Sequence, residues 1–144
     1  MIKNLSLADE EAFYKLVLLL KKKFTSLYNF EEILSSSYPQ IWGYFIENEL
    51  VGFVHLSISF ESVDIVNIVV NPSFRRRGIA SILMENILNI YPNCEQLFLE
   101  VRVDNLPAIN LYNKLGFREI NRRKNYYGDV DALVMERNIK NERC

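Results

Sequence analysis

The chain has 144 residues, of which 49% are hydrophobic and 24% are charged, and its formal net charge is −1. These values are typical of a single folded domain over residues 1–144, and they exclude a disordered chain. So small a net charge also argues against a protein that its overall field would draw to nucleic acid or to a membrane.

Cysteine content and the N-terminal residues bear on the compartment. Cys94 and Cys144 are too few for a disulfide scaffold and fit a reducing environment. No apolar run reaches membrane-spanning length, and acidic residues stand where a signal peptide would have its apolar stretch. We expect a cytoplasmic protein that is not attached to a membrane.

The first half of the chain predicts one strand, two helices and then three strands. A short strand at residues 2–6 precedes a capping box of Ser6 and Asp9 and a run of apolar residues at helical spacing. A shorter helix stops before Pro39. Strands are then expected over residues 41–47, 50–60 and 63–70, the first two joined by a tight turn at Asn48 and Glu49. The third is apolar at nearly every position, which predicts burial on both faces.

The second half alternates helices and strands. A helix from residue 79 carries on one side Ile79, Ile82, Leu83, Ile87 and Ile90. A strand over residues 96–103 leads into a helix capped by Asn105 and stopped by Gly116, and two strands follow. Consecutive strands followed by a β-α-β unit predict an α/β fold, a mixed sheet with helices on both faces.

The stretch "NPSFRRRGIA" places three arginines directly before a helix. Cations oppose the partial positive charge of a helix N-terminus, so we expect a negative group to bind there. Amides at the helix start, a glycine at position 78 and nearby guanidinium groups form a typical phosphate site. A solvated basic turn is the alternative for this pattern taken alone.

The residues around this turn resemble a known family. "VVNPSFRRRGIASILM" resembles the acetyl-CoA signature of the Gcn5-related N-acetyltransferases, here as Arg75-x-x-Gly78-x-Ala80. "LFLEVRVDNLPAINLYNKLGFREI" is similar to the second half of that family, and the order of elements agrees with it. The closest likeness is to the branch that acetylates protein N-termini, typified by the bacterial ribosomal-protein-alanine acetyltransferase. The family fold implies a mostly antiparallel sheet that splays at the cofactor site.

The resemblance implies acetyl-CoA as co-substrate, without a metal. It assigns the coenzyme A pyrophosphate to the turn formed by Arg75, Arg76, Arg77, Gly78, Ile79, Ala80 and Ser81. It assigns the pantetheine arm to the backbone of Ile68, Val69 and Val70. Asn105 should meet the cofactor near its pantetheine end, a role compatible with plain N-capping.

Two side chains are candidates for the acid–base chemistry. Alternation along "LFLEVRV" puts Glu100 on one face with Phe98 and Arg102, and we expect Glu100 to be the general base. The alternative is an exposed strand face on which Glu100 pairs with a neighbour such as Arg102. By the resemblance, Tyr112 lies beside the sulfur as general acid, whereas its apolar helical stripe alone indicates a core tyrosine.

The remaining candidates concern the acceptor. By the resemblance, Tyr126 and Tyr127 lie near an entering peptide, with strand aromatics as the alternative. The basic residues 122–124 are expected to form a solvated strand end. His55, the single histidine, is expected to be structural.

We expect an N-acetyltransferase that moves acetyl from acetyl-CoA directly to a protein α-amine, with a ribosomal-protein N-terminal alanine as a candidate. The rivals are a small-molecule amine acetyltransferase of the same fold and a non-catalytic module that binds coenzyme A or nucleic acid. The expected partner is a protein N-terminus, with no direct nucleic-acid contact, and the expected state is a monomer or weak dimer.

Overall fold

The computed structural model describes residues 1–19, 30–34, 40–58, 62–90, 96–126 and 128–138. Its strands are β1 (Ile2–Asn4), β2 (Ile41–Ile46), β3 (Glu49–Ile58), β4 (Ser62–Val70), β5 (Gln96–Arg102), β6 (Arg118–Arg123) and β7 (Ala132–Asn138). Its α-helices are α1 (Glu10–Leu18), α2 (Phe30–Leu34), α3 (Ile79–Ile90) and α4 (Leu106–Lys114). The predicted order of strands and helices is confirmed.

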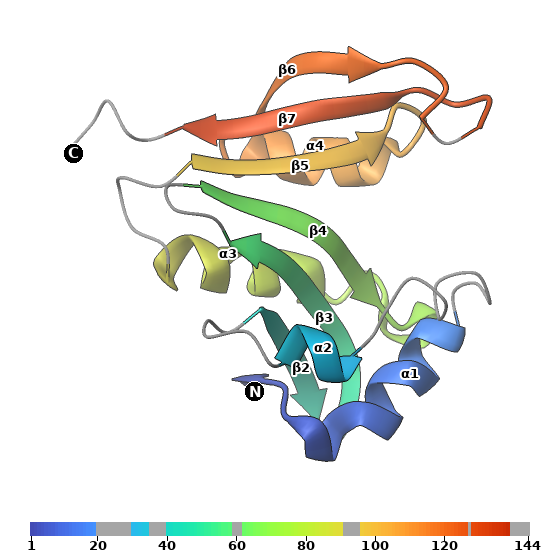
Figure 1. Cartoon of the computed structure of the whole chain (residues 1–144), viewed down its shortest axis with the longest axis vertical. Helices are drawn as coiled ribbons and strands as arrows, with labels where there is room; N and C mark the ends of the chain where they lie inside the picture. Colours follow the sequence, from blue (N-terminus) through green and yellow to red (C-terminus); the bar gives the residue numbers. More distant parts are fainter. Residues whose placement is uncertain (20–29, 35–39, 59–61, 91–95, 127, 139–144) are drawn as a thin grey trace. The chain divides into compact units, whose positions relative to one another are not determined.

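The strands form a seven-stranded sheet in the order β1-β2-β3-β4-β5-β7-β6 (Figure 1). β4 and β5 are parallel, whereas the β1–β2, β2–β3, β5–β7 and β6–β7 pairs are antiparallel. The predicted mixed, mostly antiparallel sheet is therefore confirmed. In the part of the chain that the structure describes, every helix is too short or too polar to cross a membrane.

The chain divides into two compact units, which are treated separately below. The first unit comprises Met1–Leu56 and Asn67–Asn86, and the second comprises Ser57–Val66 and Ile87–Cys144. β4 and α3 each run through both units. The sheet is expected to splay between β4 and β5 beside the cofactor. The residues concerned belong to two different units, so this splaying stays a prediction.

The core of the first unit is built by α1 and the strands β2 and β3. The buried residues that pack together are Leu5, Phe13, Leu16, Val17, Ile41, Leu50, Phe53 and Val69. The rings of Phe13 and Phe53 lie 4.8 Å apart between centroids. Ahead of α1, the Ser6 N–H donates to the Asp9 carboxylate at 2.9 Å, as expected for the predicted capping box.

Gly52 lets β3 approach its neighbours closely. A Cβ atom at this position would lie 2.9 Å from the carbonyl oxygen of Val69 and 3.3 Å from a methyl carbon of Ile79. The absence of a side chain at Gly52 therefore fixes the spacing between β3, β4 and the start of α3.

The β2–β3 turn lies one residue earlier than predicted. Its two residues are Glu47 and Asn48, with φ of 48° and 69°, and Glu49 already belongs to β3. Positive φ at both positions is the geometry that matches the twist of a two-residue hairpin.

The second unit contains β5 flanked by β4 and β7, with β6 at the outer edge (Figure 1). β5 alternates as predicted: Leu97, Leu99 and Val101 are buried, and the residues between them are partly exposed. β4 pairs with β5 from Ser62 to Ile65.

The predicted burial of both faces of β4 is wrong. β4 is not buried on both faces, because Asp64 is exposed and Val66 is 52% exposed, while Val63, Ile65 and Val69 are buried. Successive side chains of a strand point to opposite faces, so one covered face accounts for the buried set. On α3, Ile82 is 38% exposed, whereas Met84 is fully buried.

Several expected features lie outside the described residues. They include both cysteines, the lysines at residues 21–23 and the end of the second predicted helix before Pro39. Tyr127 also lies outside them.

Candidate active site

The basic turn of the first unit leads from the end of β4 into α3. The Asn71 N–H donates to the Val51 carbonyl at 2.8 Å, and the Asn71 side chain accepts from the Ser73 N–H at 2.9 Å. These bonds fix a single 3-10 turn, Pro72–Phe74, ahead of the arginines. The turn therefore starts from an anchored point of the sheet.

The arginines and the glycine lie on the surface. Arg75, Arg76, Arg77 and Gly78 are exposed, and the Arg77 guanidinium carbon lies 4.9 Å above the Phe74 ring centroid. The backbone adopts positive φ at Arg76, 65°, and at Gly78, 76°. Two left-handed residues so close together wind the chain tightly into the first turn of α3.

Gly78 is required by conformation and leaves room for a ligand. A Cβ atom there would meet nothing within 4 Å, so its φ, rather than a clash, selects glycine. The Gly78 carbonyl accepts the Ile82 N–H at 3.0 Å, which makes this residue the start of the helix. The amides of the first helical turn have no partner inside the helix and can bind an anion.

The end of β4, which precedes the turn, is buried on one face. Val69 is buried in the first unit's core, while Ile68 and Val70 are partly exposed. Partly exposed residues beside an anchored turn are compatible with the predicted contact to a pantetheine arm.

Glu100 lies on the partly exposed face of β5, opposite Val134 of β7. Its side chain is 27% exposed. One carboxylate oxygen, Oε2, is buried and has no hydrogen-bond partner within the described structure. Buried carboxylate oxygens normally have a donor, so this atom is suited to accept a proton or an N–H from a ligand.

The ionic partner of Glu100 is Arg123, at the end of β6. A terminal guanidinium nitrogen of Arg123 lies 3.6 Å from the other carboxylate oxygen, Oε1. The same guanidinium lies 5.4 Å from the ring centroid of Tyr126. The structure thus places Glu100, Arg123 and Tyr126 in one row.

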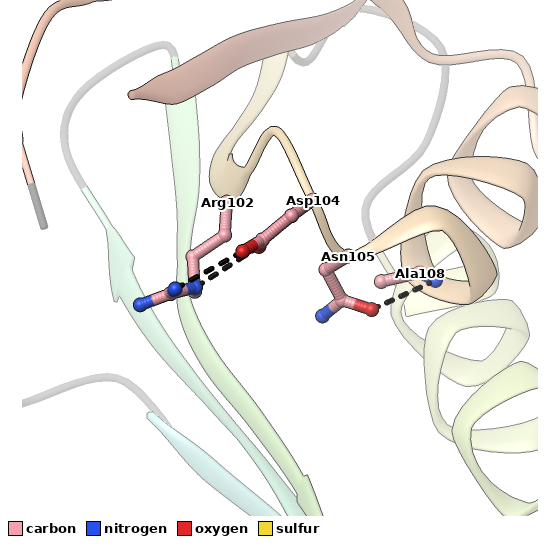
Figure 2. Close-up of polar contacts among 4 residues, drawn as sticks. All are labelled: Arg102, Asp104, Asn105 and Ala108. Carbon is pink, nitrogen blue, oxygen red and sulfur yellow. Dashed lines mark hydrogen bonds and ion pairs between the residues drawn. The ribbon is translucent and has the colours of Figure 1, made fainter. Parts of the chain in front are cut away.

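Arg102 binds Asp104, whereas the alternative interpretation of the sequence had paired Arg102 with Glu100. The two side chains form a pair of hydrogen bonds, each 3.1 Å long, at the end of β5 (Figure 2). Donation from Arg102 holds the pKa of the Asp104 carboxyl below its usual value. The pair shapes the short connection from β5 to α4.

Asn105 follows this connection and caps α4, as predicted. Its Oδ1 atom accepts the Ala108 N–H at 3.3 Å (Figure 2), and its carbonyl accepts the Ile109 N–H at 3.0 Å. Since the cap uses Oδ1, the amide NH₂ group is the part of this exposed side chain suited to donate to a ligand.

Tyr112 is the buried residue of α4, only 5% exposed. Its ring meets the Phe117 ring edge to face with centroids 6.0 Å apart. This packing agrees with a core tyrosine, and the general-acid role stays a prediction.

The loop between β6 and β7 is fixed by Asp131. Its carboxylate accepts the Asn125 N–H at 2.9 Å, and its carbonyl accepts the Val103 N–H at 3.0 Å. The loop that carries Tyr126 is thereby tied to the end of β5. This link, like the contact of Arg123 with Glu100, was not found from the sequence, because it joins residues far apart in the chain.

His55 pairs with Ile41 across β2 and β3, and burial lowers its pKa to about 4. Among the described residues we find no group of histidine, cysteine, aspartate or glutamate side chains that could hold a metal ion.

Comparison with known proteins identifies the family to which these features belong. Residues 5–117 match the acetyltransferase (GNAT) family. The chain belongs to this family. It is therefore an acetyl-CoA-dependent N-acetyltransferase, and the alternative of a non-catalytic binding module is set aside.

Three relatives illustrate the likeness. An N-alpha-acetyltransferase of Sulfurisphaera tokodaii is 32% identical over 93% of this chain and 90% of its own length. A [ribosomal protein bS18]-alanine N-acetyltransferase of Salmonella typhimurium is 35% identical over 62% of this chain and 64% of its own. The crystal structure of the ribosomal-protein-S18-alanine N-acetyltransferase from Escherichia coli superimposes with a TM-score of 0.81 at 25% identity, covering 96% of this chain and 93% of that chain.

Proposed function

We propose that this acetyltransferase modifies the α-amine of a protein N-terminus in the cytoplasm, with a ribosomal protein that begins with alanine as the first candidate. The names of the relatives support this choice of acceptor, since they refer to N-terminal α-amines and to a ribosomal-protein alanine. Acetylation of a small-molecule amine within the same fold is the competing outcome of an experiment that compares acceptors.

The phosphates of acetyl-CoA bind at the basic turn of the first unit. Backbone amides at the start of α3 donate to the pyrophosphate, and the exposed guanidinium groups of residues 75–77 add charge-assisted bonds. The positive φ of Gly78 allows the backbone to come close to the anion. The backbone of residues 68–70 pairs with the pantetheine arm.

The proposed base and acid, Glu100 and Tyr112, belong to the second unit. The observation that carries their assignment is the environment of the two carboxylate oxygens of Glu100. One of its oxygens is ion-paired with Arg123, and the other is buried without a hydrogen-bond donor in the described structure. A substrate N–H satisfies that oxygen, so Glu100 is the general base.

The reaction is a direct transfer. The neutral amine attacks the thioester carbonyl carbon, a C–N bond forms, and the proton leaves the nitrogen for Glu100. Collapse of the tetrahedral intermediate breaks the C–S bond, and Tyr112 protonates the departing thiolate. An α-amine with a pKa of about 8 is neutral often enough at pH 7 for a carboxylate to suffice as base, whereas a lysine amine with a pKa of about 10.4 is not.

The test of this assignment is Glu100→Gln. We expect kcat/KM to fall by roughly 10²–10⁴, because a general base typically contributes this much, while the affinity for acetyl-CoA stays within about twofold of wild type. The deficit should shrink as the pH rises, since the amine then loses its proton unaided. A pH profile parallel to that of the wild-type enzyme would contradict the role of Glu100 as base.

A further inference from the structure

Arg123 connects the edge strand β6 to the face of β5 that carries Glu100. Its guanidinium group contacts Oε1 of Glu100 at 3.6 Å and lies 5.4 Å from the centre of the Tyr126 ring. It is thus held between a carboxylate and an aromatic face, both of which orient a cation.

The strand register explains how Arg123 reaches Glu100. Arg123 pairs with Ala132 of β7, and Ala132 pairs with Arg102 of β5. Paired residues of neighbouring strands project to the same face of a sheet, so Arg123 and Glu100 share one face. The side chain of β7 at this position is a methyl group, which lets an arginine extend across the strand.

The two oxygens of Glu100 are therefore in different situations. Oε1 has an ionic partner, and Oε2 is buried with no hydrogen-bond partner in the described structure. A carboxylate that is held by one oxygen cannot turn freely, so the second oxygen keeps a defined direction. We propose that Arg123 is a positioning residue that holds Glu100 by Oε1 and leaves Oε2 to accept the proton of the substrate amine.

This proposal rests on the proposed role of Glu100 as the base. Transfer of the amine proton needs the acceptor oxygen within hydrogen-bond reach, so the orientation of Glu100 matters for the chemical step.

Other charged groups of the same face set the background. The strand register puts on the Glu100 face Asp64 of β4, Arg102 of β5, Glu136 of β7 and Arg118 of β6. Arg102 is bound to Asp104, and Asp64 and Arg118 are exposed. Within the described residues, Arg123 is the cation recorded within ion-pair distance of Glu100.

The experiment compares Arg123→Gln and Arg123→Lys with a matched control. Arg122→Gln is the control, because Arg122 is the neighbouring exposed arginine of β6 and pairs with Leu133, whose side chain lies on the opposite face. Arg123 is 54% exposed, and exposed ion pairs contribute little to stability, so all three variants should fold. The measurement is the single-turnover rate against pH, with acetyl-CoA and a peptide with a free N-terminal alanine both saturating.

For Arg123→Gln, we expect the rate to fall by roughly three- to tenfold, because Glu100 loses the contact that orients it. Arg123→Lys, which keeps the cation, should recover most of the rate, and Arg122→Gln should overlay the wild-type profile.

An unchanged rate in Arg123→Gln, or an equal loss in Arg122→Gln, would overturn the proposal. The proposed base is tested separately. If Glu100→Gln keeps the wild-type profile, the base is misassigned and the role of Arg123 falls with it. If Glu100→Gln loses activity while Arg123→Gln behaves as wild type, only the role of Arg123 is wrong.

Discussion

Tyr112 combines two properties that usually belong to different residues. It is nearly fully buried and packs against Phe117, as a core residue does. A tyrosine hydroxyl is also able to donate a proton to a departing thiolate. Removing only the hydroxyl group separates these properties.

Tyr112→Phe should lower kcat by about one to three orders of magnitude, because one proton donor is lost while the ring and its packing remain. Thermal stability and acetyl-CoA affinity should hold. An acetyl donor with a more acidic leaving thiol should restore part of the rate of Tyr112→Phe and none of the rate of Glu100→Gln. Full activity of Tyr112→Phe with acetyl-CoA itself would remove Tyr112 from the mechanism.

His55 makes the stability of the first unit depend on pH. Its folded pKa of about 4 lies below the ordinary value of 6.5, so the unfolded chain binds the proton first as the pH falls. The free energy of unfolding should therefore decrease between pH 6.5 and pH 4, and His55 should add no further loss below pH 4. After discounting for its partial exposure, we expect about 2–3 kcal/mol from this residue.

Denaturant unfolding of wild type and His55→Gln at pH 7 and pH 4 measures this contribution. The wild-type loss should exceed the loss of the variant by the amount above, since the carboxylates are common to both. Equal losses in the two proteins would show that His55 is not the titrating group.

The local sequence pattern predicts the position of a residue in its helix or strand better than it predicts the residue's interaction partners. Asn105 as helix cap and Glu100 on the partly exposed face of β5 both follow from spacing and alternation, and both are confirmed. The ionic partner of Glu100 could not be predicted, because Arg123 reaches it across β7 from a distant part of the chain. Arg102, its neighbour in sequence, pairs instead with Asp104.

At the scale of elements, the basic turn of the first unit carries the cofactor prediction. Gly78→Val should lower the affinity for acetyl-CoA by at least about tenfold, because valine resists positive φ and the amides then leave their positions. Arg76→Ala should cost less, since it removes one exposed cation and keeps the amides. Calorimetric titration with acetyl-CoA measures both.

Gly128→Val is the matched control for backbone strain. Gly128 has φ of 80°, and a Cβ atom there would also meet nothing within 4 Å, but it lies in the second unit, after β6. It should bind acetyl-CoA as the wild type does. Normal binding by a folded Gly78→Val would place the phosphates elsewhere.

The order of the elements followed from the local sequence pattern, while their degree of burial did not. The spacing of apolar residues predicts α3 and β5 correctly, because each period of 3.6 or 2 is sustained. The apolar run of β4 suggested two buried faces, yet Val66 is half exposed. An apolar side chain on a surface violates no rule of folding, so composition cannot exclude it.

At the scale of the whole molecule, the residues to which we assign the two tasks of the enzyme belong to different compact units. The first holds the turn assigned to the phosphates, and the second holds Glu100, Tyr112 and Arg123. The fold and the acetyl transfer could be predicted from a motif, because the chemistry fixes the residues of that motif. The acceptor could not be predicted from the residues in the same way, since acceptor specificity has no comparable local signature in this chain.

The proposed function depends most on where the enzyme places the acetyl group. The direct measurement uses a peptide with both a free N-terminal alanine and an internal lysine, incubated with the enzyme and acetyl-CoA, and locates the added acetyl group by tandem mass spectrometry. The same peptide with a blocked N-terminus and a panel of small amines serve as comparators. We expect acetylation at the α-amine and none on the blocked peptide. Acetyl groups on the lysine of the blocked peptide, or turnover confined to the small amines, would contradict N-terminal acetylation.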